Sequence, residues 1–237
     1  MDGFASIRQR AEMRKGGAAA LAALLPAVPD PGLLAAMPDD RVLAEMARRI
    51  FCSGFVWRVI ESKWPGFEAA FAGFDVARLC FEPDEFWEAL GRDARIVRHG
   101  AKIQSVRANA RFVADVAAEH GSFARFLSAW PAADQAGLLE LLARRGSRLG
   151  GMTGQYLLRF LGRDGWIAGR DVVACLRLAG LELSAGAMNR GDLRRIGAAM
   201  QAWAMESGLP LLHVSRICAF SVGENRTDAA DMNRDAD

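Results

Sequence analysis

The stretch RRGSRLGGMTGQYLLRFLG, residues 144–162, places Gly150, Gly151 and Gly154 between a group of arginines and an apolar helical pattern that begins at Tyr156. Glycine lets a backbone approach a bound group closely, and the free N–H groups of a helix start bind anions. A tight turn between two packed helices requires the same residue. The stretch therefore predicts a glycine-rich hairpin before a buried helix, which either binds an anion or only turns the chain.

The composition is that of a globular protein. Of the 237 residues, 51% are hydrophobic and 24% are charged, which allows a sizeable core. No apolar run approaches the roughly 20 residues that cross a bilayer, and the charged N-terminus has no secretion-signal pattern. The four cysteines, Cys52, Cys80, Cys175 and Cys218, form no CxxC pair. Such spacing is typical of reduced thiols, and we expect a cytoplasmic protein without membrane contact.

The charge is distributed unevenly. The whole chain carries +2, but residues 223–237 carry −3 and leave +5 for residues 1–222. Lysine occurs only at Lys15, Lys63 and Lys102, and arginine supplies the remaining basic residues. Arginine suits bidentate contacts with phosphate, although a GC-rich genome produces the same bias.

Apolar residues recur with helical period through most of the chain, and no segment alternates as a strand does. The pattern predicts an all-α protein. A helix within residues 39–55 is expected to have its N-cap at Asp39 or Asp40, and a long helix within residues 101–121 is expected to end at a Gly121 C-cap. Further helices are expected within residues 131–146, 169–181, 190–208 and 209–223.

Three parts follow from composition. Residues 1–37 are expected to form a helical N-terminal extension. Its alanine-rich stretch, residues 16–38, is interrupted by Pro26, Pro29 and Pro31, which predicts one short helix and an irregular connector. Residues 38–222 contain the periodic helices and are expected to form one domain. Residues 223–237 are expected to be disordered.

Three segments together resemble a known family. They are FCSGFVWRVIESKWPGFEAAFAGFD (51–75), RIVRHGAKIQSVRANARF (95–112), and the opening stretch with its continuation RDGWIAGRDVVAC (163–175). In this order they are similar to the DNA 3-methyladenine glycosylase I family of the helix–hairpin–helix glycosylase superfamily, over roughly residues 40–180. The second segment is the most specific. The resemblance implies an all-α helix–hairpin–helix glycosylase-like fold for residues 38–222.

The resemblance also gives the hairpin a function. It implies that the backbone amides of GGMTG, residues 150–154, grip DNA phosphates without reading sequence. This hairpin is one residue longer than the superfamily's usual Gly-hydrophobic-Gly. Positive charge near the phosphates would come from arginines of the same stretch. The expected DNA-binding residues are Arg98, Lys102, Arg148, Gly150, Gly151, Thr153 and Gly154.

A glycosylase must flip its target base out of the stack and hold it in an aromatic pocket. By resemblance, Trp57 in GFVW is the stacking tryptophan, unless it is a core residue. The family places a glutamate eight residues earlier, where this chain has Arg49. Three readings remain open: Arg49 turns outward, another acid such as Glu45 or Glu61 serves, or the preferred base has changed. The expected substrate-binding residues are Trp57, Arg49, Phe55 and Glu61.

The family's zinc site has no counterpart in the sequence. Of the pair expected after the hairpin, Cys175 remains but the histidine position holds Asp171, and no Cys or His precedes Cys52. His213 with Cys218 is more typical of a core helix. Since a structural zinc needs four ligands, we expect neither zinc nor another cofactor.

The chemistry implied is hydrolysis. Many superfamily members use an aspartate shortly after the hairpin, at a position that is Gly169 here. Asp171 lies two residues further on and is the candidate catalytic residue, unless it only caps a helix beginning at Val172. An alkylated purine already carries positive charge and leaves easily. No lysine is suitably placed near the hairpin for a Schiff base, so we expect a monofunctional enzyme.

The sequence thus predicts a monomeric glycosylase of base excision repair that acts on double-stranded DNA containing an alkylated purine similar to 3-methyladenine. The alternative on the same fold is a catalytically inactive DNA-binding protein, which the Arg49 exchange and the missing zinc ligands favour. A third reading is an all-α protein-interaction domain, with FARFLSAWP and the C-terminal helix as its surface. The second family-like segment argues against it.

Overall fold

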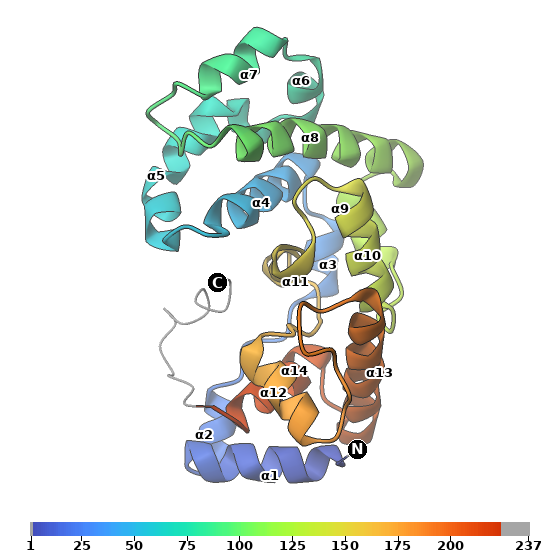
Figure 1. Cartoon of the computed structure of the whole chain (residues 1–237). Helices are drawn as coiled ribbons and strands as arrows, with labels where there is room; N and C mark the ends of the chain where they lie inside the picture. Colours follow the sequence, from blue (N-terminus) through green and yellow to red (C-terminus); the bar gives the residue numbers. More distant parts are fainter. Residues whose placement is uncertain (1, 224–237) are drawn as a thin grey trace. The chain divides into compact units, whose positions relative to one another are not determined.

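The computed structural model describes residues 2–223, and these contain helices and loops but no β-strand (Figure 1). The all-α prediction is therefore confirmed. The predicted disorder of residues 223–237 falls almost entirely outside the described residues. No described helix is both long and apolar enough to pass through a bilayer.

The described residues form two compact units. The first comprises residues 2–29, 131–140 and 164–223, and the second comprises residues 30–130 and 141–163. We call them the terminal unit and the central unit. Helices of the terminal unit are α1 Phe4–Lys15, α2 Ala18–Ala23, α12 Arg170–Leu178, α13 Arg190–Ser207 and α14 Leu211–Phe220. Helices of the central unit are α3 Pro31–Ala35, α4 Asp39–Cys52, α5 Trp57–Ala70, the 3₁₀ helix η1 Ala72–Phe74, α6 Val76–Phe81, α7 Asp84–Leu90, α8 Gly100–His120, α9 Phe123–Ala129 and α11 Gly151–Phe160. The helix α10 Gln135–Arg145 has residues in both.

Aromatic rings form much of the central unit's core. Phe51 of α4 meets Phe67 of α5 edge to face at 4.7 Å between ring centroids, and Trp64 stacks on Phe74 at 5.6 Å. Offset and edge-to-face pairs add about 0.5–1.5 kcal/mol each beyond the area they bury. The long helix α8 packs against α4, α6 and α9. It ends, as predicted, at Gly121, whose φ of 83° is the left-handed conformation that favours glycine.

The terminal unit packs α14 against α1, α12 and α13. The helix α13 begins with a capping box in which Asn189 accepts from the backbone N of Asp192 and the Asp192 carboxylate accepts from the backbone N of Asn189. The alanine-rich residues 16–38 contain two helices, α2 and α3, where the sequence predicted one.

Two predicted turn features are corrected. The N-cap of α4 is Pro38, with Asp39 and Asp40 in the first turn. Asp39 instead accepts a hydrogen bond from the backbone N of Phe123 at 2.8 Å, which ties α4 to the start of α9. The hairpin lies at residues 146–150, four residues earlier than predicted, since α11 already begins at Gly151.

Candidate functional site

The first half of α8 carries a row of buried polar side chains, Lys102, Ser105 and Asn109, spaced three and four residues apart on one helix face. Ser105 donates to the carbonyl of Lys102 within the helix. The other two reach segments far away in the sequence. The helix therefore contacts two loops through this one row.

Lys102 is only 5% exposed, and its Nζ donates to the carbonyl oxygens of Phe51 at 3.2 Å and Ser53 at 2.5 Å, where α4 ends. The last carbonyls of a helix lack partners within the helix. Burial and, secondarily, the charge of Arg148 lower the pKa of Lys102 to about 8. Because the amine lies against the chain's own backbone, the expectation that it contacts DNA is corrected.

Asn109 is fully buried and holds the hairpin. Its Nδ2 donates to the carbonyl of Ser147 at 3.0 Å, and its Oδ1 accepts from the Ser147 backbone N at 2.8 Å. The next residue, Arg148, has a φ of 60°, which non-glycine residues adopt at a cost. Leu149 then buries its side chain completely. The paired bonds and the buried leucine fix a backbone shape that Arg148 alone would not favour.

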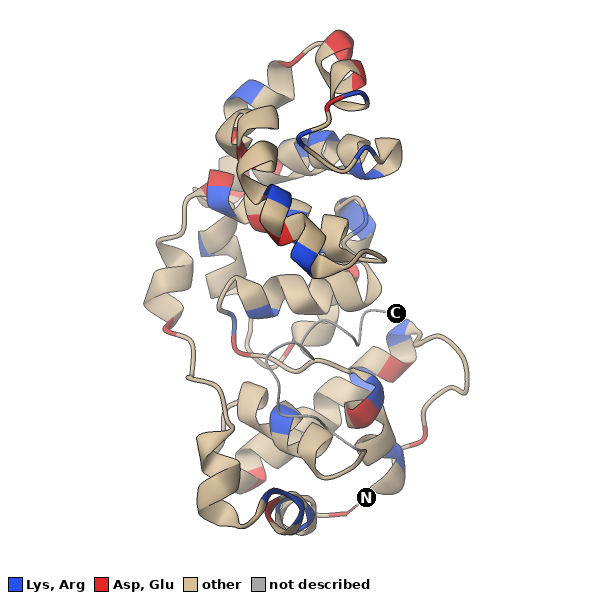
Figure 2. Ribbon diagram, turned by 90° about the vertical axis from the view of Figure 1, so that its left-hand side faces the viewer, with Lys and Arg blue, Asp and Glu red and all other residues tan. Residues whose placement is uncertain are grey.

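The hairpin exposes positive charge and free backbone donors. Arg148 is exposed, as are Arg144 and Arg145 at the end of α10; of the three, only Arg145 has an acidic partner within 4 Å among residues 2–223, Glu119 at 3.9 Å. The N-cap of α11, Gly150, provides no side-chain oxygen, so the first N–H groups of the helix are not capped by it. Elsewhere, acidic and basic positions are interspersed along the helices of both units (Figure 2). The hairpin therefore has the features of an anion site.

The remaining predicted DNA-binding residues differ in their placement. Arg98 is exposed just before α8. Gly151 is exposed with a φ of 58°, and Thr153 is half-buried in the first turn of α11. Gly154 is buried within α11, which removes it from the hairpin and corrects the predicted contact.

An apolar surface surrounds the connection between α4 and α5. Phe55 is 41% exposed, Val56 67% and Val59 43%, while Trp57 is half-buried as the first residue of α5. The ammonium of Lys102 lies 4.4 Å from the centre of the Phe55 ring. Trp57 is therefore not enclosed in the core, and a flat group can reach an apolar surface here.

Arg49 does not turn outward. It is 7% exposed, its Nε lies 2.6 Å from Oε1 of Glu45, and its guanidinium lies 3.8 Å from the centre of the Phe160 ring. Burial raises the pKa of Glu45, while the charges of Arg49 and then Arg48 oppose that rise. The pair carries no net charge when Glu45 is ionised.

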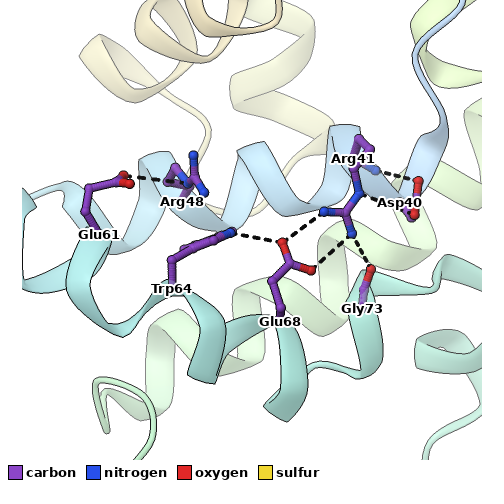
Figure 3. A network of polar contacts seen from close by, with 7 residues as sticks. All are labelled: Asp40, Arg41, Arg48, Glu61, Trp64, Glu68 and Gly73. Atoms are coloured by element: carbon purple, nitrogen blue, oxygen red, sulfur yellow. Dashed lines mark hydrogen bonds and ion pairs between the residues drawn. The ribbon is translucent and has the colours of Figure 1, made fainter.

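A second network holds α4 to α5 (Figure 3). Glu68 accepts from Nε1 of Trp64 at 2.9 Å and from both Nη atoms of Arg41 at 2.9 and 3.1 Å. Arg48 lies 4.1 Å from the Trp64 ring centre and 3.7 Å from Oε1 of Glu61. Glu61, one helical turn after Trp57, is thus paired with a cation on α4.

Asp171 lies in the terminal unit, whereas all the other predicted site residues lie in the central unit. It occupies the first turn of α12, which begins at Arg170 with Gly169 as its N-cap, so it does not cap a helix from Val172. Its carboxylate interacts with Lys15 and lies against Gly223.

Among residues 2–223, no group of three or more His, Cys, Asp or Glu side chains is placed to hold a metal ion. Cys175 and Cys218 lie together in the terminal unit, and Ser221 donates to the Cys175 sulfur at 3.2 Å. Both thiols are buried. His213 instead contacts the carbonyl of Pro26 at 2.8 Å.

Residues 35–139 match the family model of methyladenine glycosylases. This segment runs from the end of α3 into α10 and includes two of the three stretches, residues 51–75 and 95–112, on which the predicted resemblance rests. No curated protein matches the chain.

Solved structures of 3-methyladenine DNA glycosylase I resemble the chain. One, from Staphylococcus aureus and described as the structural basis of 3-methyladenine recognition, is 21% identical, covers 53% of this chain and 77% of its own, and has a TM-score of 0.48. A variant of the enzyme in complex with 3-methyladenine is 20% identical over 53% and 80%, with a TM-score of 0.47. Another is 26% identical over 53% and 80%, with a TM-score of 0.44.

Sequence reasoning missed the roles of Lys102 and Asn109. The available signal was their spacing: polar residues at 102, 105 and 109 share one helical face with Ile103, Val106 and Ala110 nearby. Polar side chains within an apolar face are expected to have partners when buried. Their particular partners, however, lie 49 to 51 and 38 residues away along the chain.

Proposed function

We propose that the chain is a monofunctional DNA glycosylase that hydrolyses the N-glycosidic bond of an alkylated purine, similar to 3-methyladenine, in double-stranded DNA. The observation that carries this proposal is the methyladenine glycosylase match over residues 35–139. That segment includes Trp57, with its half-buried ring, and the helix α8 that braces the hairpin. We further propose that the protein acts in the cytoplasm as a monomer.

The hairpin is proposed to hold the DNA backbone. Arg148 and the exposed amide of Gly151 supply charge and a hydrogen-bond donor at the start of α11, and Arg98 adds a second exposed cation. Backbone and arginine contacts of this kind fix register on the duplex but carry no sequence information. Binding should therefore weaken as salt rises and depend little on sequence.

The flipped base is proposed to stack on Trp57, with Phe55 beside it. Stacking on an aromatic side chain is worth about 1–3 kcal/mol for a base. Arg49 need not repel a cationic purine, because Glu45 pairs with its charge at 2.6 Å. Glu61 is similarly paired with Arg48 at 3.7 Å, and we assign it to the edge of the base site.

The chemical step needs little from the protein. A purine that already carries positive charge is a good leaving group, so binding and desolvation supply most of the required stabilisation. Water then attacks C1′ as the bond to the base breaks, which leaves an abasic site and a free base. Asp171 is the candidate acid that orients this water. Lys102 does not serve as a Schiff-base nucleophile in this proposal, because its amine is buried and bound to two carbonyls.

The test is base release from methylated DNA, measured by chromatography. Trp57→Ala should reduce the rate about 5- to 150-fold, because it removes stacking worth about 1–3 kcal/mol. Phe81→Ala is the matched control: Phe81 is also an aromatic residue of the central unit, on α6, and is 88% exposed. Equal activity in both variants would refute the base site. Absence of release with retained DNA binding would favour the inactive DNA-binding alternative. Asp171→Asn tests the proposed acid in the same assay.

A further inference from the structure

We propose that Lys102 and Asn109 are positioning residues with separate tasks: Lys102 holds the segment that presents Trp57, and Asn109 holds the hairpin that binds DNA. The proposal rests on the proposed glycosylase function for its enzymatic consequences. It makes α8 the common support of two sites that come from distant parts of the chain.

The task of Lys102 follows from where α4 ends. Its amine bonds the carbonyls of Phe51 and Ser53, on either side of the last helical residue, Cys52. A cation at a helix C-terminus is favourable because the helix dipole and the unpaired carbonyls both attract it. Gly54 then turns the chain with a φ of 68°, and Trp57 begins α5 three residues later. The amine thus fixes the direction in which the chain leaves α4.

The task of Asn109 follows from the hairpin's strained backbone. Both bonds between Asn109 and Ser147 are made by a fully buried side chain, so water cannot replace them at low cost. They end one residue before Arg148, whose φ is 60°. Without them, the hairpin would lose the contacts that hold this conformation next to the start of α11.

The two tasks predict different defects, one in the rate of base release and one in the affinity for DNA. A misplaced Trp57 impairs the bound complex, and a misplaced hairpin impairs formation of the complex. Lys102→Met removes the donors while keeping most of the side chain's volume. Asn109→Asp keeps the acceptor and the shape but replaces the donating Nδ2 by an oxygen facing the Ser147 carbonyl. Lys102→Arg keeps a cationic donor and serves as the conservative variant.

The first readout is hydrogen exchange, which needs no enzymatic activity. In the wild type, the amides of Ser53 and Phe55 bond the carbonyls of Arg49 and Cys52, and the amide of Ser147 bonds Asn109. Lys102→Met should accelerate exchange at Ser53 and Phe55 about tenfold or more and leave the hairpin unchanged. Asn109→Asp should accelerate exchange at residues 146–150 and leave residues 53–57 unchanged. A tenfold change corresponds to about 1.4 kcal/mol, the scale of one hydrogen bond.

The second readout separates DNA binding from base release. Lys102→Met should lower the single-turnover rate at saturating enzyme about tenfold, with the Kd for undamaged duplex within about twofold of the wild type. Asn109→Asp should raise that Kd about tenfold, with the saturating rate within about threefold. Lys102→Arg should recover most of the lost rate.

Three results would overturn the proposal. Exchange that rises uniformly over the central unit in either variant would reduce both residues to general stabilisers of the fold. Unchanged exchange at residues 53–57 in Lys102→Met would refute the task of Lys102. If each variant lost both DNA affinity and single-turnover rate to a similar extent, the assignment of separate tasks to Lys102 and Asn109 would be refuted. If the wild type released no base, the proposed function would fail, while exchange and duplex affinity would still decide the positioning tasks.

Discussion

The buried pair of Arg49 and Glu45 gives the sharpest stability prediction. Arg49→Met keeps an apolar side chain against Phe160 but removes the partner of a carboxylate that is 15% exposed. Breaking a buried ion pair on one side typically costs about 3–5 kcal/mol. Protonation of Glu45 limits this loss of stability. A glutamate with an unfolded pKa near 4.3 can take up a proton at pH 7 for about 3.7 kcal/mol, so an unpaired Glu45 cannot destabilise the protein by more than this.

The cost of Arg49→Met must therefore depend on pH. Burial already raises the pKa of Glu45 in the folded protein, and loss of the arginine removes an opposing effect. A carboxyl whose folded pKa lies above its unfolded value destabilises the protein increasingly as pH rises through and above the unfolded value. At pH 5 the greatest loss of stability that the unpaired carboxylate can cause falls to about 1 kcal/mol. We expect a loss of about 3 kcal/mol at pH 7 and about 1–2 kcal/mol at pH 5, including the weaker contact with Phe160.

The assay is urea unfolding of the wild type, Arg49→Met, Glu45→Gln and the double variant, each at pH 5 and pH 7. The double variant should recover most of the pH-dependent loss, because it leaves no unpaired charge. A loss of the same size at both pH values would refute the reasoning, as would a double variant no more stable than Arg49→Met at pH 7.

Three further changes test other parts of the structure. Gly66→Ala should lower the free energy of unfolding by about 1–3 kcal/mol, since its Cβ would lie 2.5 Å from the Arg95 carbonyl oxygen; thermal melting checks this, and an unchanged melting temperature would contradict the packing. Arg195 and the backbone N–H of Asn189 hold the pKa of Asp192 well below its usual range. Its contribution to stability is therefore fully present above about pH 4 and declines as pH falls further toward the folded pKa. Asp192→Asn should lower the melting temperature at pH 7, and the difference from the wild type should shrink steadily below pH 4. Arg148→Ala should weaken duplex binding at low salt and reduce the slope of log K against log salt by about 1, whereas an unchanged slope would remove Arg148 from the phosphate contacts.

The helices were predictable because their apolar residues repeat with the helical period, and Gly121 ends α8 for a local reason. The start of α4 was not, because Asp39 bonds the distant Phe123 backbone in preference to capping its own helix. The hairpin was predicted four residues too late because its turn was assigned to the glycines. In the structure Arg148 takes the left-handed conformation that glycine usually adopts, and the glycines that follow it lie in α11 or at its N-cap.

The site was predictable only where the family resemblance named a position. The resemblance assigned Trp57 to the base site and the hairpin arginines to DNA, and the structure places Trp57 half-buried and the arginines exposed. Glu45 was named only as an acid that could serve in place of the family's glutamate, and its pairing with a buried Arg49 that lies against Phe160 depends on packing that no local pattern shows. Lys102 was assigned to DNA contact because it lies in the second family-like segment, and its partners in the structure are backbone carbonyls that no local pattern identifies.

We have proposed that this chain removes an alkylated base from DNA and leaves the strand intact. The most direct measurement counts free bases and abasic sites released over time from methylated duplex DNA, together with strand breaks, by mass spectrometry and gel electrophoresis. We predict 3-methyladenine as the main product, abasic sites in equal number, and no breaks above the untreated control. Breaks in proportion to released base would contradict the monofunctional mechanism, and no released base from DNA that the protein binds would contradict the claim itself.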